Sequence, residues 1–220
     1  MSSPNTVLVS IPTGDCWVHK RTAAAMQWLL RDTLGYRVTV IQPSHRPFEN
    51  NLHHIVRQVL RDGYDYWLTF DADNPPRGRN PLELVDFDLD IVGCPTPVWH
   101  WTEDDAGQRP IYWNAYARSE TEDGYTEWPT KSGLQKVDAV GTGCLLTARR
   151  VWEHPAMQSG AFQRKTNHDG TVDRGNDISF CERATEAGFE IFAHYEYPCS
   201  HFVELDLCDV ILATEAVHRG

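Results

Sequence analysis

Apolar runs and amphipathic stretches alternate over the first third of the chain. Between the apolar runs, residues at helical spacing predict a helix over residues 19–34, stopped by Gly35, and a second helix that begins at Asn50 or Asn51 and ends at Gly63. The runs themselves are rich in β-branched and aromatic residues and predict buried strands at residues 6–12, 36–41 and 66–70. This βαβαβ order predicts an α/β fold with a single doubly wound, mostly parallel sheet flanked by helices.

The rest of the chain has a different pattern. A strand is expected at residues 90–94, and residues 95–135 combine Pro, Trp, Tyr and acidic groups in a way that favours short antiparallel strands and loops. Residues 160–174 are polar and are the expected mobile loop. The other expected elements are two short strands joined at a Gly-rich turn, a helix, a strand and a closing helix, at residues 137–148, 177–187, 189–193 and 205–217.

Length, charge and cysteine spacing narrow the class of protein. The 220 residues favour one domain, and 41% apolar residues suffice for a packed core. A net charge of -11 excludes a uniformly basic nucleic-acid clamp but leaves a local basic groove open. The six cysteines contain no C-x-x-C pair, so we expect reduced thiols, with a zinc site at Cys199, His201 and Cys208 as the alternative. Because neither a signal-peptide pattern nor an apolar run of about 20 residues is present, a cytoplasmic location is expected.

The strongest chemical signal is Phe70-Asp71-Ala72-Asp73, which ends the third predicted strand. Carboxylates at the carboxyl end of a parallel strand project into the crevice where such folds bind ligands. Two aspartates one residue apart can share a divalent cation, and Mg²⁺ or Mn²⁺ suits both carboxylate and phosphate oxygens. The alternative is an exposed, Asp-rich turn ahead of Pro75.

Five segments in order resemble glycosyltransferases with the A-type fold, of family-2-like, bacterial or phage type. Residues 65–73 (DYWLTFDAD) resemble the D-x-D strand of that family, and His45-Arg46 with Asn50-Asn51 resembles the helix start before it. Residues 140–146 (VGTGCLL) resemble the strand that lines the acceptor side, residues 175–181 (GNDISFC) resemble a helix start that often reads Glu-Asp, and Ser200-His201 stands where the family often has a histidine ligand. The resemblance covers residues 6–203. It implies a nucleotide-sugar-binding half at about 1–94 and an acceptor-side half at about 95–220.

The resemblance also implies roles for particular residues. Asp71, Asp73 and His201 would hold Mn²⁺ or Mg²⁺, with Asp73 as a direct ligand and Asp71 reaching the ribose or the metal through water. The donor, expected to be a UDP-sugar, would bind at Pro12, Thr13, Gly14, Arg46, Asp71, Ala72 and Asp73. The hydroxyl acceptor would bind at Trp99, Trp101, Gly141, Thr142, Gly143 and Asn176. From the residues alone, 12–15 could equally be an ordinary turn, and the two tryptophans could equally belong to the core.

Asp177 has two interpretations. In inverting enzymes of the family, the acid at this place is the general base that deprotonates the acceptor hydroxyl. At the start of a predicted helix, it could instead be an N-cap. Asn176 stands where the family more often has Glu, which weakens the transfer of the catalytic role.

Three other functions compete with a glycosyltransferase. Phosphatases of the haloacid dehalogenase type also carry D-x-D, but normally after the first strand. Sugar nucleotidyltransferases normally have a Gly-rich, basic loop after the first strand, where this chain has Pro12-Thr13-Gly14-Asp15. A non-catalytic nucleotide-sugar-binding module is the third. The acceptor could be a small molecule, a glycan, a protein or a hydroxymethylated DNA base, the last disfavoured by the acidic charge.

Overall fold

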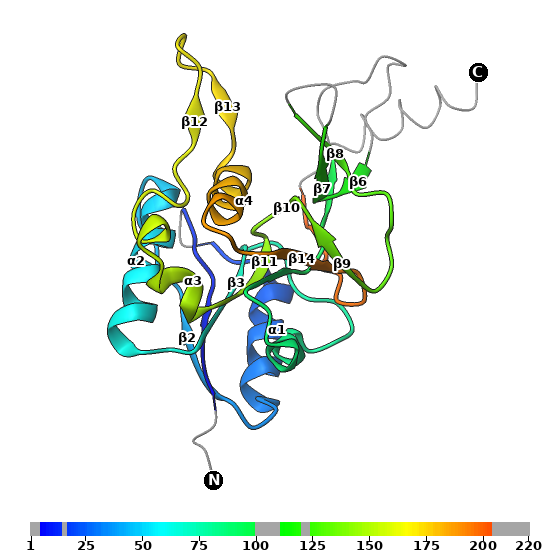
Figure 1. Cartoon of the computed structure of the whole chain (residues 1–220). Helices are drawn as coiled ribbons and strands as arrows, with labels where there is room; N and C mark the ends of the chain where they lie inside the picture. The colour runs from blue at the N-terminus through cyan, green and yellow to red at the C-terminus, as the bar shows by residue number, and fades with distance from the viewer. Residues whose placement is uncertain (1–4, 15–16, 100–110, 120–123, 204–220) are drawn as a thin grey trace, which may run out of the picture.

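The computed structural model describes residues 5–14, 17–99, 111–119 and 124–203. Its centre is a seven-stranded sheet in the order β2-β1-β3-β11-β4-β14-β9 (Figure 1). Five strands run in one direction, and β9 and β11 run opposite to them. The sheet consists of β1 (Thr6–Ser10), β2 (Arg37–Ile41), β3 (Tyr66–Phe70), β4 (Ile91–Gly93), β9 (Leu134–Val137), β11 (Cys144–Ala148) and β14 (Ile191–His194). The predicted mostly parallel α/β sheet is confirmed.

Helices cover both faces of this sheet because side chains alternate along each strand. On one face, Val7 and Val9 pack with α1 (Lys20–Arg31) and the 3₁₀ helix η1 (Pro81–Phe87). On the other face, Leu8 and Trp67 pack with α2 (Phe48–Asp62), α3 (Arg149–Glu153) and α4 (Asn176–Glu186). A second 3₁₀ helix, η2 (Pro155–Met157), follows α3. No helix among the described residues is long and apolar enough to cross a membrane.

The helix ends differ from prediction for local reasons. The predicted start of α2 at Asn50 or Asn51 was wrong, because the helix begins at Phe48 directly after Pro47. Asn51 instead points inward, where its Nδ2 donates to the Thr13 carbonyl (2.9 Å) and its Oδ1 accepts from the His45 N–H (2.5 Å). Gly63 ends α2 as predicted, with φ 73°, a conformation that favours glycine. Helix α1 ends at Arg31, three residues before the predicted Leu34.

Short antiparallel sheets lie beside the central one. They are formed by β5 (Pro97–Trp99) with β6 (Ile111–Trp113), and by β10 (Ala139–Val140), β7 (Ala115–Arg118) and β8 (Tyr125–Glu127). Antiparallel strands were expected in this region. The two strands predicted at 137–148 are β10 and β11, but they enter different sheets on either side of the turn at residues 141–143. That turn is therefore a junction between the two sheets.

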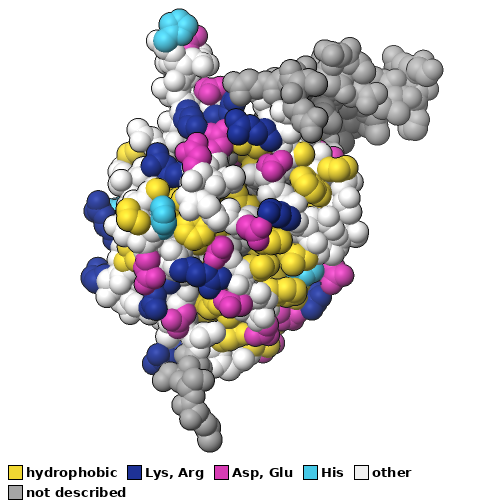
Figure 2. Space-filling model, viewed as in Figure 1, with side chains coloured by type: hydrophobic (Ala, Val, Ile, Leu, Met, Phe, Trp, Pro, Cys, Tyr) yellow, Lys and Arg dark blue, Asp and Glu magenta, His cyan; other side chains and the backbone are white. Residues whose placement is uncertain are grey.

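Residues 160–174 form more structure than the predicted loop. Ala161 and Phe162 are 1% exposed and belong to the core. The segment continues into a hairpin of β12 (Lys165–Thr166) and β13 (Val172–Arg174), which projects from the body of the molecule near α2 and α4 (Figure 1). The predicted closing helix at 205–217 lies outside the described residues. On the face seen in Figure 2, acidic and basic side chains are interspersed.

Candidate active site

A cavity of about 360 Å³ lies at the carboxyl end of β3. Four separate segments bring predicted residues to it: the end of β3, the turn between β10 and β11, the start of α4, and the segment after β14. The predicted residues that line it are Asp71, Asp73, Gly141, Thr142, Gly143, Asn176, Asp177 and His201. The fold therefore gathers the predicted carboxylates, the histidine and the Gly-rich turn around one space.

The backbone around Asp71 and Asp73 is fixed by hydrogen bonds to neighbouring segments. The Asp71 N–H donates to the Gly143 carbonyl at 2.8 Å, and the Asp73 carbonyl accepts from the Phe202 N–H at 3.1 Å. A Cβ added to Gly143 would lie 3.2 Å from Asn74 Nδ2 and 3.5 Å from Asp71 Oδ2. Glycine at this position thus lets the turn approach the aspartates closely.

His201 is oriented toward Asp73. Its Nδ1 lies 2.9 Å from the Pro97 carbonyl oxygen, which can only accept, so Nδ1 carries the proton in the neutral ring. The Nε2 atom, 3.6 Å from Asp73 Oδ2, then keeps a lone pair on the cavity side. A carbonyl partner of this kind commonly fixes the tautomer of a metal-binding histidine.

The cavity concentrates negative charge. Burial, together with the nearby Asp73 and Asp177 carboxylates, raises the pKa of Asp71 to about 7. Burial also raises the pKa of Asp177, whereas backbone N–H groups and the Arg164 guanidinium act in the opposite direction. The two carboxylates are hard oxygen ligands that suit Mn²⁺ or Mg²⁺, and the imidazole nitrogen is a borderline ligand that fits Mn²⁺ better than Mg²⁺. The ligand atoms of Asp71, Asp73 and His201 do not all lie within 4.8 Å of one another in the part of the chain that the structure describes.

Asp177 lies in the first turn of α4. The N-cap position belongs to Gly175, so the N-cap interpretation of Asp177 was wrong in its position. Its Oδ1 nevertheless accepts from the Ile178 N–H at 2.8 Å, which satisfies one of the free donors of the helix start. A Cβ at Gly175 would lie only 2.7 Å from this oxygen. The carboxylate can therefore stabilise the helix end and face the cavity at once.

Asn114 supports the part of the cavity wall that the turn at residues 141–143 forms. Its Oδ1 accepts from the Thr96 N–H at 2.7 Å, and its backbone carbonyl accepts from the Gly141 N–H at 2.8 Å. A Cβ at Gly141 would come within 2.1 Å of Asn114 Nδ2, closer than packed atoms allow. Glycine is thus required at 141 for the turn to lie against Asn114.

Several predicted donor-binding and acceptor-binding residues do not line the cavity: Pro12, Thr13, Gly14, Arg46, Ala72 and Trp99. Arg46 Nε donates to the Gly14 carbonyl at 2.8 Å, so it holds the turn after β1. Ala72 packs against the apolar core, and Trp99 is half-buried in β5. Trp101 and Asp15 lie outside the described residues, as do Cys16 and Cys208.

Seven further residues line the cavity: Phe48, Asn74, Thr96, Val98, Asn114, Tyr116 and Arg164. Asn74 follows the D-x-D segment directly, so its position in the chain could have suggested it. Phe48 is the first residue of α2, and the others come from short strands and loops with no distinctive motif. Only the way these segments fold back beside β3 and α4 brings them to the site.

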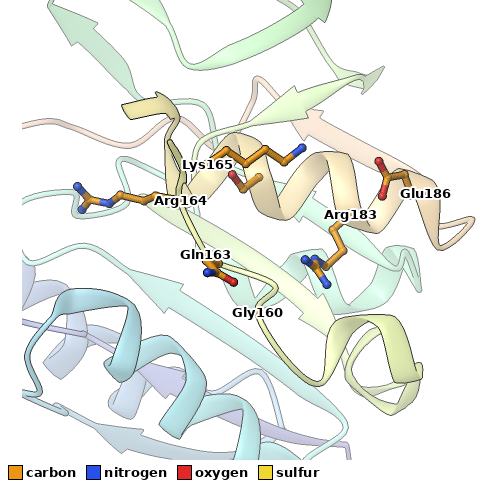
Figure 3. A pocket seen from close by; sticks show the side chains of 7 residues that line it. Gly160, Gln163, Arg164, Lys165, Arg183 and Glu186 are labelled. Atoms are coloured by element: carbon orange, nitrogen blue, oxygen red, sulfur yellow. The ribbon is translucent and has the colours of Figure 1, made fainter. Parts of the chain in front are cut away.

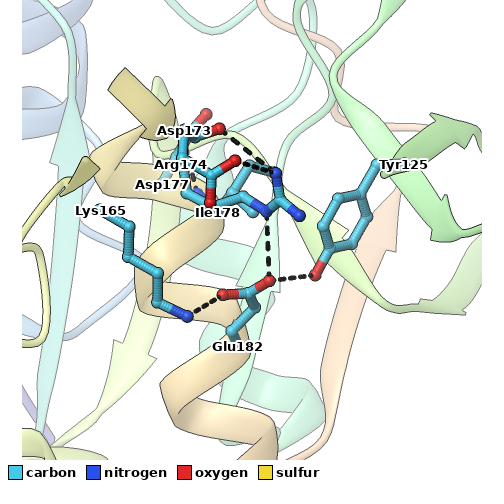
Figure 4. A network of polar contacts seen from close by, with 7 residues as sticks. All are labelled: Tyr125, Lys165, Asp173, Arg174, Asp177, Ile178 and Glu182. Atoms are coloured by element: carbon cyan, nitrogen blue, oxygen red, sulfur yellow. Dashed lines mark hydrogen bonds and ion pairs between the residues drawn. The ribbon is translucent and has the colours of Figure 1, made fainter. Parts of the chain in front are cut away.

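Arg164 also lines a second, smaller cavity of about 220 Å³ between α4 and residues 160–165 (Figure 3). That cavity contains none of the three aspartates of the first. Arg164 Nε pairs with Glu49 at 2.5 Å, which ties this segment to α2. Beside it, Glu182 of α4 pairs with Lys165 (2.5 Å) and Arg174 (3.6 Å) and accepts from the Tyr125 hydroxyl (3.4 Å), so it anchors the hairpin (Figure 4).

No family model matches the chain, and no curated protein matches it by sequence. Among solved structures it is similar to A197 from STIV, at 13% identity over 91% of this chain and 86% of that chain, with a TM-score of 0.55. It is also similar to GalNAc-T7 with UDP, GalNAc and Mn²⁺, at 9% identity over 92% of this chain and 44% of that chain, with a TM-score of 0.53. The chain thus spans less than half the length of the GalNAc-T7 chain. These likenesses show that the chain has an α/β fold also found in a protein whose crystal structure contains UDP, GalNAc and Mn²⁺.

Proposed function

We propose that the chain is a metal-dependent glycosyltransferase that moves a sugar from a nucleoside-diphosphate sugar, with UDP as the expected nucleotide, to a hydroxyl acceptor. One observation carries the proposal. Asp71, Asp73 and Asp177 come from two distant segments and meet in one cavity, together with an imidazole nitrogen whose lone pair faces the same space. A bare structural role would not explain three carboxylates in a partly buried cavity, since buried carboxylates that lack a cation are costly.

The metal site would be formed by Asp73 and His201. Asp71, which lines the same cavity, would reach the metal through water or bind the ribose. When bound, Mn²⁺ or Mg²⁺ supplies a Lewis acid that offsets charge on the leaving diphosphate. Arg164, a cation on the cavity wall, would add to this effect.

Asp177 would be the general base. Its carboxylate would accept the proton of the acceptor hydroxyl as the oxygen attacks the anomeric carbon on the side opposite the diphosphate, so the configuration would invert. Burial raises its pKa, and a carboxylate with a raised pKa is a stronger base near neutral pH. Asn176 and the turn at 141–143 would position the acceptor.

The chemical class of the acceptor follows from the cavity only in part. Tyr116, Thr96 and Asn114 offer aromatic, hydroxyl and amide groups of the kind that bind a sugar or another polyhydroxy compound. The net charge of -11 and the mixed charges of Figure 2 disfavour long contacts with DNA phosphates. A hydroxymethylated DNA base therefore ranks behind small molecules, glycans and proteins.

The test is metal-dependent release of nucleoside diphosphate from a panel of nucleotide sugars, with Asp73→Asn compared with the wild type. We expect Asp73→Asn to lose activity by at least about 100-fold, as the loss of a metal ligand should cost at least as much as the loss of a supporting group. Thermal stability should stay close to that of the wild type.

Asp62→Asn is the matched control, because Asp62 is a carboxylate at the end of α2 that pairs with Arg61 and does not line the cavity. The Asp62→Asn variant should leave the release of nucleoside diphosphate unchanged. Release of inorganic phosphate would favour a phosphatase, formation of a nucleotide sugar from a nucleoside triphosphate would favour a nucleotidyltransferase, and binding without release would favour a non-catalytic module. Each of these outcomes contradicts the proposal.

A further inference from the structure

Three cysteines that are far apart in the sequence meet in the interior of the protein. Cys94 follows β4, Cys144 begins β11, and Cys199 lies in the segment after β14. All three are at most 2% exposed, and their sulfur atoms lie within 4.8 Å of one another. Two backbone hydrogen bonds hold the segments together, from the Cys94 N–H to the Cys144 carbonyl (2.8 Å) and from the Cys199 N–H to the Pro95 carbonyl (3.0 Å).

Ordinary packing does not explain this arrangement fully. Buried cysteines often act as small apolar side chains. Cys181, which is equally buried, does so here, and its sulfur contacts the backbone of Val140 at 3.4 Å. In the cluster of Cys94, Cys144 and Cys199, the sulfurs instead face one another. Hydrogen bonds from the other two thiols lower the pKa of Cys94, which reflects this mutual orientation.

We propose that Cys94, Cys144 and Cys199 form a structural site for a thiophilic divalent metal ion, of which Zn²⁺ is the expected example. Zinc–sulfur bonds of about 2.3 Å in tetrahedral geometry place sulfurs about 3.8 Å apart, so the cluster needs to contract by no more than about 1 Å. A disulfide would require two sulfurs to approach to about 2.05 Å and would leave the third thiol without a role.

The site would be structural because no substrate can reach sulfurs this deeply buried. Each thiol would give its proton to solvent as it binds the ion. The ion would join the ends of β4 and β11 to the segment that carries His201, two residues beyond Cys199. This inference does not rest on the proposed function, because the cysteines do not line the candidate active site.

Cobalt titration of the full-length, reduced and chelator-treated protein tests the site. Thiolate ligands give Co²⁺ an intense near-ultraviolet charge-transfer band, whereas carboxylate and imidazole ligands at Asp73 and His201 do not. We expect this band to saturate at one Co²⁺ per chain and to disappear when Zn²⁺ is added. The protein as purified should contain Zn²⁺ by elemental analysis.

The matched variants are Cys144→Ser and Cys199→Ser in the cluster and Cys181→Ser outside it. Each cluster variant should weaken Co²⁺ binding by at least about 100-fold or abolish the band, and Cys181→Ser should bind as the wild type does. If a serine variant fails to fold, Cys94→Ala supplies the comparison, with circular dichroism in chelator as the check of folding. Absence of the band in wild type, an unchanged band in folded cluster variants, or a disulfide between two cluster cysteines would overturn the proposal.

Discussion

At the scale of single residues, Asp177 combines two tasks that the sequence presents as alternatives. Its Oδ1 accepts from the Ile178 N–H at the start of α4, and its side chain also lines the cavity that holds Asp71 and Asp73. Gly175 makes this geometry accessible, since a side chain there would collide with the carboxylate. A substitution that keeps the hydrogen bond but removes the basic oxygen can separate the tasks.

Asp177→Asn is that substitution, because asparagine accepts the same backbone hydrogen bond as aspartate. Loss of a general base typically costs about 10²–10⁴-fold, so transfer should fall by that much while donor affinity and melting temperature hardly change. The product of the wild type should have the inverted anomeric configuration by NMR coupling constants. A retained configuration, or a loss of stability with no loss of rate, would contradict the role as base.

Asp71 should make the metal-free protein sensitive to pH. The pKa of Asp71 in the folded state is about 7, against 3.8 as the ordinary value. Between these two pH values, the folded state therefore binds a proton that the unfolded state does not. The contribution of Asp71 to stability is therefore present at low pH and lost as the pH rises through 7.

Melting temperatures measured in EDTA should show this dependence as a difference between wild type and Asp71→Asn. The variant should gain stability relative to wild type as the pH rises from 5 to 8. A difference that is constant across this range would show that Asp71 does not titrate there.

At the scale of elements, the β12–β13 hairpin depends on α4 for its position. Glu182 is 10% exposed at its side chain and pairs with Lys165 and Arg174, one on each strand of the hairpin. The segment is therefore an anchored hairpin, where the sequence predicted a polar loop. Whether the segment becomes more ordered with donor, as lids do, is still a prediction, and hydrogen exchange with and without donor measures it.

Glu182→Gln should loosen the hairpin without unfolding the core. Both ion pairs lose their carboxylate. Because Lys165 is half exposed, we expect the hairpin to lose only about 1 kcal/mol of local stability, which is about a fivefold loss of protection from hydrogen exchange. Hydrogen exchange should rise at residues 165–174 and stay the same in α2. Glu186→Gln, on the same helix, is the control and should change the hydrogen exchange of neither the hairpin nor α2.

At the scale of the whole molecule, the cavity is built by joining segments that belong to different layers. The sheet contributes Asp71 and Asp73, α4 contributes Asp177, and the small antiparallel sheets contribute the opposite wall. A ligand that contacts all of these layers should stabilise the folded chain as a unit, because it binds the folded state alone.

Mn²⁺ with UDP should therefore raise the melting temperature of the wild type. At about 100 times the dissociation constant the stabilisation is about 2.7 kcal/mol, which corresponds to about 5–10 °C for a chain of this size. EDTA should abolish the shift, and Asp73→Asn should show little of it. An equal shift in Asp73→Asn and wild type would argue against a metal at this carboxylate.

The sequence alone predicted the α/β layers, because strand and helix periods and the stop at Gly63 are local properties of the chain. It also determined the D-x-D segment, since two aspartates after a buried strand must emerge at the edge of the sheet. It took the tertiary structure to show that Asn51 points inward, that the turn at 141–143 joins two sheets, and that Thr96, Asn114 and Tyr116 line the cavity. The convergence of Cys94, Cys144 and Cys199 was decided there as well. The physical reason is that these positions depend on contacts between segments tens of residues apart, which no local period or capping preference encodes.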